Sequence, residues 1–122
     1  MSTLPNRRVL VVDDNVDAAR SLGVLIAQLG YDVQIAHDGL AALEFGRGTV
    51  PHVVFLDINM PGADGFEVVR RLRADPRLSR TRFVALSGHA EPEYQERARE
   101  VGFSDYFLKP LRLDLLPIIL AK

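Results

Sequence analysis

The side chains in this sequence that are best suited to chemistry directly follow, or end, apolar segments. They comprise three carboxylates, one hydroxyl and one ammonium group, from Asp13, Asp14, Asp57, Ser87 and Lys109. Carboxylates that lie close together raise one another's pKa or require a cation. A hard divalent ion suits them, because Mg²⁺, or Mn²⁺ in its place, prefers oxygen ligands.

The hydroxyl and the ammonium group suit a different ligand. Ser87 could donate a hydrogen bond to a phosphoryl oxygen, and Lys109 could balance the negative charge of that group. A carboxylate can act as the nucleophile toward phosphorus. The set therefore indicates phosphoryl transfer, with Asp57 as the nucleophile or as a metal ligand.

These residues share one site only if the segments that carry them are parallel strands. Apolar runs that end at a charge, at Pro or at Gly predict buried strands. We expect strands at residues 7–13, 32–36, 52–57, 82–87 and 104–108, the second at a sheet edge because it is more polar. The carboxyl ends of parallel strands meet at one edge of the sheet, where ligands bind in open α/β folds.

Helical patterns separate the predicted strands. The expected helices cover residues 15–29, 38–45, 64–74, 92–102 and 111–121, and the last must begin near Leu113 so that Pro117 falls in its first turn. Strands that alternate with helices predict right-handed βαβ units. We therefore predict an α/β fold, a doubly wound three-layer (βα)5 sandwich with a parallel five-stranded sheet. The expected strand order is 2-1-3-4-5, as in flavodoxin-like folds.

Local patterns predict how three of the helices are built. In the first helix one apolar face has 4-3-4 spacing and consists of Ala18, Leu22, Leu25 and Leu29. Asp64 and Glu67 form a pattern similar to a capping box at the start of the third helix. The helix over 92–102 has few apolar residues, which predicts a lightly anchored element that could change position.

Composition limits the function further. The 122 residues form one domain, placed at 7–122 after a flexible tail at 1–6, and 48% of them are hydrophobic. The net charge of −1 gives no reason to expect direct contact with nucleic acid or an anionic membrane. No apolar run approaches the roughly 20 residues of a membrane span. The absence of Cys excludes thiolate chemistry and is typical of a reducing compartment, so we expect a cytoplasmic protein.

Four motifs in this order resemble the receiver domain of bacterial response regulators. They are VLVVDDN at 9–15, DINMPGADG at 57–65, ALSG at 85–88 and YFLKP at 106–110. The resemblance covers the chain from residue 7 to its end. The Ser-Gly pair at 87–88 and the segment GFSDYFLKP are similar to receivers attached to hybrid sensor histidine kinases.

The resemblance implies a role for each candidate residue. Asp57 would accept a phosphoryl group from a phosphohistidine on a sensor histidine kinase or phosphotransfer protein. Asp14, Asp57 and the backbone carbonyl of Asn59 would ligate Mg²⁺, with Asp13 acting through water. Ser87 and Lys109 would contact the phosphoryl oxygens, and the Lys109-Pro110 peptide bond is expected to be cis.

The same resemblance implies a switch. Tyr106 would turn inward as the Ser87 hydroxyl moves to the phosphoryl group, and the face formed by the fourth helix, fifth strand and fifth helix would change shape. Asn59 and His89 would flank the path of an attacking water and tune phosphoryl lifetime. A downstream protein that reads this face is implied, and a dimer that forms on phosphorylation is compatible with it. Such a domain catalyses only its own phosphorylation and dephosphorylation and is not a turnover enzyme.

Two other functions are compatible with parts of the pattern. A Mg²⁺-dependent phosphohydrolase of the haloacid-dehalogenase type needs two acids in a D-x-D arrangement after the first strand, whereas Asp13 and Asp14 are adjacent. A flavodoxin-like cofactor binder needs a phosphate-binding loop there, which the same acids would repel. Taken one by one, Asp13 and Asp14 could cap a helix, Lys109 could be a surface residue and Tyr106 a strand aromatic. The histidines, His37 and His52 among them, lack metal-ligand spacing.

Overall fold

The elements occur in the alternating order that the sequence predicts. The computed structural model describes residues 7–60 and 64–122, so the expected tail at 1–6 lies outside the described residues. The strands are β1 (Arg8–Val12), β2 (Asp32–Ala36), β3 (Val53–Asp57), β4 (Arg82–Ser87) and β5 (Asp105–Leu108). The α-helices are α1 (Val16–Gln28), α2 (Gly39–Gly48), α3 (Gly65–Arg73), α4 (Pro92–Val101) and α5 (Leu116–Ala121). Short 3₁₀ helices cover Pro76–Leu78 and Leu113–Leu115.

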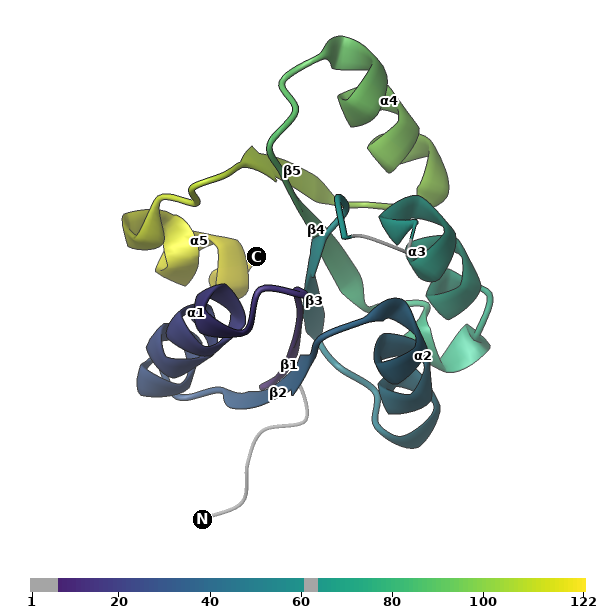
Figure 1. The fold of residues 1–122 in the computed structure, drawn as a ribbon. Coiled ribbons are helices and arrows are strands. Elements are labelled where there is room, and N and C mark those ends of the chain that lie inside the picture. The colour runs from purple at the N-terminus through teal and green to yellow at the C-terminus, as the bar shows by residue number, and fades with distance from the viewer. Residues whose placement is uncertain (1–6, 61–63) are drawn as a thin grey trace.

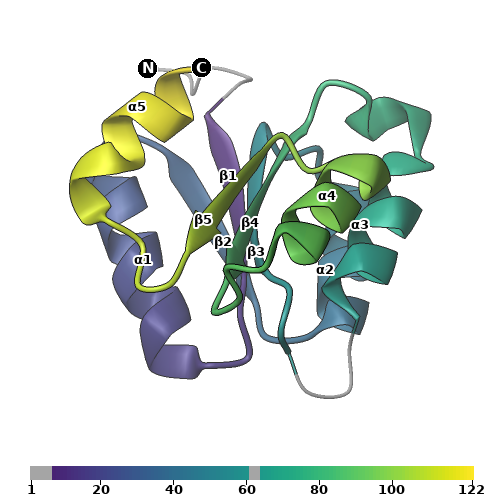
Figure 2. The ribbon, with the colours of Figure 1, turned by 90° about the horizontal axis from the view of Figure 1, so that it is seen from above.

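The strands form one parallel sheet in the order β2-β1-β3-β4-β5. Helices α1 and α5 cover one face of this sheet, and α2, α3 and α4 cover the other (Figure 1; Figure 2). This is the doubly wound, three-layer flavodoxin-like fold that the alternation predicts, and the polar strand β2 lies at an edge as expected.

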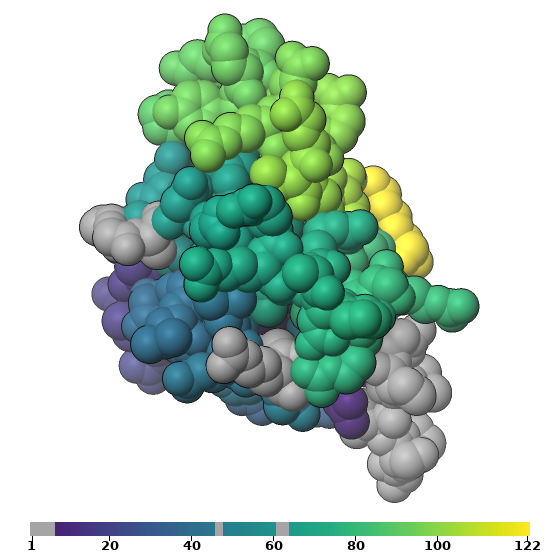
Figure 3. All heavy atoms as spheres, turned by 90° about the vertical axis from the view of Figure 1, so that its right-hand side faces the viewer, coloured from purple at the N-terminus to yellow at the C-terminus, as the bar shows by residue number. Residues whose placement is uncertain are grey.

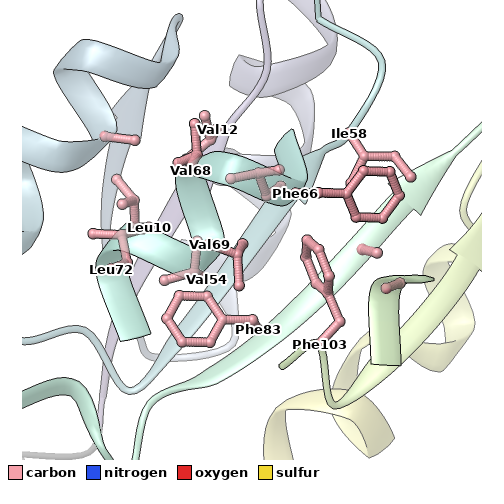
Figure 4. Packing of buried hydrophobic residues seen from close by; sticks show 14 of the residues in the cluster. Leu10, Val12, Val54, Ile58, Phe66, Val68, Val69, Leu72, Phe83 and Phe103 are labelled. Atoms are coloured by element: carbon pink, nitrogen blue, oxygen red, sulfur yellow. The ribbon is translucent and has the colours of Figure 1, made fainter. Parts of the chain in front are cut away.

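The core has two halves, one on each face of the sheet. Alternate side chains of a strand point to opposite faces. In β1, Leu10 and Val12 belong to the half beneath α2, α3 and α4, whereas Val9 and Val11 belong to the half beneath α1 and α5. Every residue of β3 is buried, because this central strand is covered on both faces. Figure 4 shows the first half, in which Val68, Val69 and Leu72 of α3 lie over the sheet.

The register of the sheet brings the strand ends together. Val12 of β1 pairs with Leu56 of β3, and Ser87 of β4 pairs with Leu108 of β5. Asp57 pairs with Leu86, one residue before Ser87. The residues that follow β1, β3, β4 and β5 therefore lie next to one another at a single edge.

The buried face of α1 differs from the predicted one. Leu22 and Leu25 of the predicted face do pack in the core, but Ala18 is exposed and Leu29 is 40% exposed, and Ala19, Gly23 and Ile26 are buried instead. The helix contains two overlapping apolar faces, and the close approach of Gly23 to β2 selects between them. A Cβ atom at Gly23 would lie 3.2 Å from Cδ1 of Ile35.

The helix ends show two further corrections. Asp64 caps α3 by accepting a hydrogen bond from the Phe66 amide at 3.0 Å, but Glu67 does not complete a capping box. The Glu67 carboxylate instead pairs with Arg70 and Arg71 on the next turn, in place of the main-chain N–H of Asp64 that a capping box would use. Helix α2 continues to Gly48 rather than ending at Phe45.

The last helix starts later than residue 111, as Pro117 requires. The 3₁₀ turn at Leu113–Leu115 precedes α5, and Pro117 lies in the first turn of α5. A proline is tolerated there because the amide it lacks would have no partner within the helix.

Helix α4 is the least deeply packed of the helices on its face. Only Ala98 is buried, while Tyr94 and Val101 are half-buried against the core. The helix lies at one end of the surface formed by α2, α3 and α4 (Figure 3). A bilayer-spanning helix is not found among the described residues, since none of their helices combines the required length with the required hydropathy.

Candidate functional site

The predicted site residues converge at the carboxyl edge of the sheet. The Lys109 ammonium Nζ lies 2.9 Å from Oδ2 of Asp57 and 3.3 Å from Oδ2 of Asp13. Asp13, Asp14 and Asp57 each offer a carboxylate oxygen, and these oxygens all lie within 4.8 Å of one another. The structure thus joins residues from the ends of three strands into one cluster of charges.

Main-chain hydrogen bonds beyond the strand ends hold this cluster in place. The Asp13 amide donates to the carbonyl of Ala36 at 3.1 Å, and the Lys109 amide donates to the carbonyl of Ser87 at 2.8 Å. Each buried carboxylate is also oriented by a local amide. Asn15 N–H donates to Asp13 and Asn59 N–H donates to Asp57, at 3.0 and 2.9 Å. The Lys109-Pro110 peptide bond is cis, as the resemblance implied.

The cluster contains two buried carboxylates, and Lys109 balances only part of their negative charge. Asp13 and Asp57 are 4% and 5% exposed, whereas Asp14 is exposed. Burial, together with the charge of Asp57, raises the pKa of Asp13, although the Asn15 amide and Lys109 act in the opposite direction. Burial lowers the pKa of Lys109, but hydrogen bonds and charge attraction to Asp57 and Asp13 outweigh it, so the pKa is raised.

These donors fit a hard divalent cation. Three carboxylate groups face one ammonium group, so the cluster carries more negative than positive charge. Oxygen ligands at one exposed and two buried carboxylates match the preference of Mg²⁺ for a few protein oxygens plus water. The chemistry of the donor set therefore supports a cation on the side of the cluster where Asp14 is exposed.

Ser87 lies beside the carboxylates but its hydroxyl is engaged elsewhere. The side chain is fully buried, and its Oγ donates to Oδ1 of Asn59 at 3.0 Å. The same Oγ accepts a hydrogen bond from the His89 amide at 3.0 Å. Sequence reasoning assigned Asn59 and Ser87 to the site but did not predict this contact, which joins residues 28 positions apart.

Tyr106 and His89 are linked to the same loop. The half-buried Tyr106 donates its phenolic O–H to the carbonyl of His89 at 2.7 Å. The His89 ring stacks on the ring of Tyr94, with centroids 4.3 Å apart and an interplanar angle of 5°. The loop between β4 and α4 is therefore held by Ser87, Tyr106 and Tyr94. The sequence analysis assigned Tyr94 no role at this loop.

His37 supports the first acid and was missed by the sequence analysis. Its ring Nδ1 lies 3.0 Å from the carbonyl oxygen of Asp13. A carbonyl only accepts, so Nδ1 carries the proton in this contact. The contact ties the segment after β2 to the segment after β1. Its only sequence signal is that Asp13 ends one predicted strand and His37 directly follows another.

An apolar groove adjoins the cluster on the side of α1. It has a volume of about 460 Å³ and lies between α1 and the segment that follows β5. Leu22, Leu25, Leu111 and Leu113 line it, and it reaches Asp13 and Lys109. A partner that sits in this groove would lie directly beside the charged cluster.

Comparisons with known proteins agree on one family. Residues 9–121 match the family described as response regulator receiver domain. The chain is 33% identical over 115 residues to the regulatory protein AtoC of Escherichia coli. The matched region covers 94% of this chain but only 24% of AtoC. The chain thus spans about a quarter of the length of this relative.

Solved structures of similar length give the same result. The chemotaxis protein CheY4 of Vibrio cholerae matches with a TM-score of 0.89 and 28% identity, covering 95% of this chain and 97% of that one. The receiver domain of a sensor histidine kinase from Pseudomonas aeruginosa, with a magnesium ion in its active site cleft, matches with a TM-score of 0.84 and 27% identity. That match covers 94% of both chains.

Proposed function

This chain belongs to the response regulator receiver domain family, and we propose that Asp57 is the residue on which it accepts a phosphoryl group. Receiver domains are phosphoacceptor switches of two-component systems and take the phosphoryl group from histidine kinases or phosphotransfer proteins. The observation that carries the proposal is the position of Asp57. It is buried at the end of the central strand, 2.9 Å from the Lys109 ammonium and beside Asp13 and Asp14.

The step on this chain is a nucleophilic displacement at phosphorus. A carboxylate oxygen of Asp57 forms a bond to phosphorus, and the donor's imidazole nitrogen leaves with the electron pair of the broken P–N bond. Lys109, already bound to Asp57, balances charge that moves onto the phosphoryl oxygens. The buried position of Asp57 limits access of water to the acyl phosphate that forms.

We propose Mg²⁺, or Mn²⁺, as the cofactor of this step. Asp14, Asp57 and the backbone carbonyl of Asn59 would hold the ion, with Asp13 acting through water. When bound, the ion neutralises negative charge on the carboxylates and on the phosphoryl group. The support for this assignment is the excess of carboxylates over cations at the cluster and the exposure of Asp14.

We further propose that phosphorylation changes the face formed by α4, β5 and α5. A phosphoryl group adds acceptors close to Ser87, and movement of Ser87 would disturb its bond to the His89 amide. The carbonyl of His89 holds Tyr106, and its ring stacks on Tyr94 of α4. The shallow packing of α4, with only Ala98 buried, makes this helix the element most easily shifted. A downstream protein would read this face, and a phosphorylation-dependent dimer would use it as well.

The apolar groove beside α1 is the proposed contact for the phosphoryl donor. The donor must bring its phosphorylated imidazole to Asp57, and Asp13 and Lys109 form part of the groove lining. Its leucine lining offers apolar surface to a helix of the partner.

Mass spectrometry of the intact protein after incubation with acetyl phosphate and Mg²⁺ tests the assignment. We expect one added phosphoryl group on the wild type, and none on Asp57→Asn or after removal of divalent ions. Asp38→Asn is the matched control, because Asn can also cap α2 and the position is outside the site. A phosphoryl group that persists in Asp57→Asn would refute the proposal. Sustained hydrolysis of many phosphate esters per protein would favour the phosphohydrolase instead.

A further inference from the structure

The side chain of Asn59 gathers hydrogen bonds from the loop that follows β4. Its Oδ1 accepts from the Ser87 hydroxyl at 3.0 Å and from the Gly88 amide at 3.3 Å. An amide N–H₂ cannot accept from a main-chain N–H, so the Gly88 contact identifies the atom as the oxygen. The main-chain N–H of Asn59 also donates to Oδ1 of Asp57 at 2.9 Å. Asn59 therefore connects the proposed phosphoacceptor to Ser87.

The hydroxyl of Ser87 has a single proton to donate. In this structure that proton goes to Asn59, while the oxygen lone pairs face the His89 amide. Ser87 is fully buried, so water offers no alternative acceptor for the proton. A phosphoryl group on Asp57 could receive this hydrogen bond only if the contact with Asn59 breaks.

From this competition we infer that Asn59 is a positioning residue that retains the Ser87 hydroxyl and opposes the switch. The inference rests on the proposed function of Asp57 and adds a regulatory role for the Asn59 side chain. Asn59 is exposed, so its oxygen can bind water once Ser87 leaves. The charged phosphoryl group is the stronger acceptor and wins the competition. The hydrogen bond to Asn59 reduces the net free energy gained when the Ser87 hydroxyl moves to the phosphoryl group.

The direct test measures binding of beryllofluoride, a stable mimic of the phosphoryl group, in the presence of Mg²⁺. Asn59→Leu keeps a similar side-chain volume but removes the acceptor. We expect it to tighten beryllofluoride binding by about threefold to tenfold, the effect of removing one competing neutral hydrogen bond. Gln28→Leu, which removes an exposed amide from the far end of α1, is the control and should leave the affinity unchanged.

A double-mutant cycle with Ser87→Ala separates this mechanism from an effect on Asp57 alone. In the Ser87→Ala background there is no hydroxyl to retain, so Asn59→Leu should have no effect on beryllofluoride affinity. An equal gain in both backgrounds would overturn the inference, because Asn59 would then act without Ser87. No gain in the background that retains Ser87 would overturn it as well.

A second measurement uses the protein without Mg²⁺ or beryllofluoride. The Gly88 amide loses its acceptor in Asn59→Leu, so its hydrogen exchange should become faster than in the wild type. An unchanged Gly88 exchange rate would contradict the contact. Asn59→Ala serves as a second variant if the leucine is poorly tolerated. A wild type that fails to bind beryllofluoride would refute the function of Asp57, whereas binding without the difference between backgrounds would refute only the role of Asn59.

Discussion

At the scale of single residues, the site concentrates three carboxylates around one ammonium group. Lys109 contacts Asp57 and Asp13, while Asp14 lies nearby without a contact to Lys109 among the described interactions. Burial makes the charge on Asp13 costly, and the neighbouring charge of Asp57 adds to that cost. The charged form of Asp13 is therefore costly in the cation-free protein, and a cation bound beside it would offset that cost.

We predict that Asp14→Asn stabilises the protein without divalent ions but weakens the stabilisation that Mg²⁺ provides. Without divalent ions the substitution should raise the free energy of unfolding, because it removes one of three like charges. With Mg²⁺ the wild type should gain stability, by about 1.4 kcal/mol at ten times Kd, and the variant should gain less. Urea denaturation with EDTA and with Mg²⁺ measures both effects.

Asp17→Asn provides the control for this comparison. It removes the same charge from an exposed position in the first turn of α1, outside the carboxylate cluster. The control should keep the full response to Mg²⁺. An equal response in Asp14→Asn and in the wild type would remove Asp14 from the proposed metal site.

At the scale of elements, α3 and α4, the helices that follow the strands of Asp57 and Ser87, are anchored to different degrees. Helix α3 buries five residues, Gly65, Phe66, Val68, Val69 and Leu72, whereas α4 buries only Ala98. The first turn of α3 is pressed against the segment that follows β3. Helix α4 adds to Ala98 only the half-buried Tyr94 and Val101 and surface contacts, such as the ion pair of Arg97 with Asp64 at 3.3 Å. The difference favours α4 over α3 as the element that moves in the proposed switch.

Gly65→Ala should destabilise the protein by about 1–3 kcal/mol, as expected when a methyl group is forced into a filled space. The new Cβ would lie 2.6 Å from the main-chain Cα of Ile58, which cannot move without distorting the end of β3. The control is Gly48→Ala, since a Cβ there has no neighbour within 4 Å. Urea denaturation should show a loss for the first variant only, and equal stabilities would contradict the close packing.

Hydrogen exchange should distinguish the two helices in the native protein. We expect the amides of α4 to exchange at least tenfold faster than those of α3, because opening α4 exposes less buried apolar surface. Exchange monitored by NMR measures each helix separately. Equal protection of α3 and α4 would argue against α4 as the element that moves in the switch.

At the scale of the whole molecule, polar contacts gather at the opposite edge of the sheet from the site. Arg82 donates to the carbonyl of Lys122 at 2.9 Å and to that of Ile119, and its guanidinium lies 3.8 Å from the Asp105 carboxylate. These contacts join β4, β5 and the end of α5. His52 lies next to this group, and its carbonyl accepts from the Arg82 amide at 3.0 Å. A polar network that joins β4, β5 and α5 thus lies at the sheet edge opposite the proposed chemistry.

This arrangement predicts a pH dependence of folding. Burial, and secondarily the charge of Arg82, lowers the pKa of His52 in the folded protein. Between the folded and the unfolded pKa the unfolded chain binds more protons, so stability should fall as the pH decreases from about 6.5 through the folded value. The contribution is fully present above that window. His52→Gln should flatten this part of the stability profile, measured by urea denaturation from pH 7.5 to 5. An unchanged slope in the variant would contradict the prediction.

Much of the fold could be predicted because its signals are local. The bounds of β2 and β4 agree with those expected, β3 and β5 begin one residue later than expected, and β1 is one residue shorter at each end. Apolar runs, caps and prolines depend on neighbours within a few positions, so a single sequence contains them. The convergence of the candidate site residues followed from the rule that ends of parallel strands share an edge. The chemical roles of Asp57, Asn59 and Tyr106 stay predictions that the proposed experiments test.

The predictions for helices α1 and α3 failed where the sequence was compatible with more than one local arrangement. The apolar face of α1 was wrong in part. Leu22 and Leu25 pack in the core as predicted, but the side of the helix that carries Gly23 faces β2, so Ala19 is buried in place of Ala18. The capping box at α3 was wrong because Glu67 has arginine partners within reach on its own helix.

By itself the sequence determined the order of the elements and the side chains that end each strand, since both depend on short-range patterns of apolar and polar residues. Only the tertiary structure decided which of those side chains touch. The hydrogen bond between Asn59 and Ser87 joins residues 28 positions apart, and the hydrogen bond between His37 and Asp13 joins residues 24 positions apart. The physical reason is that such contacts depend on strand register and loop path, and the whole core sets these together.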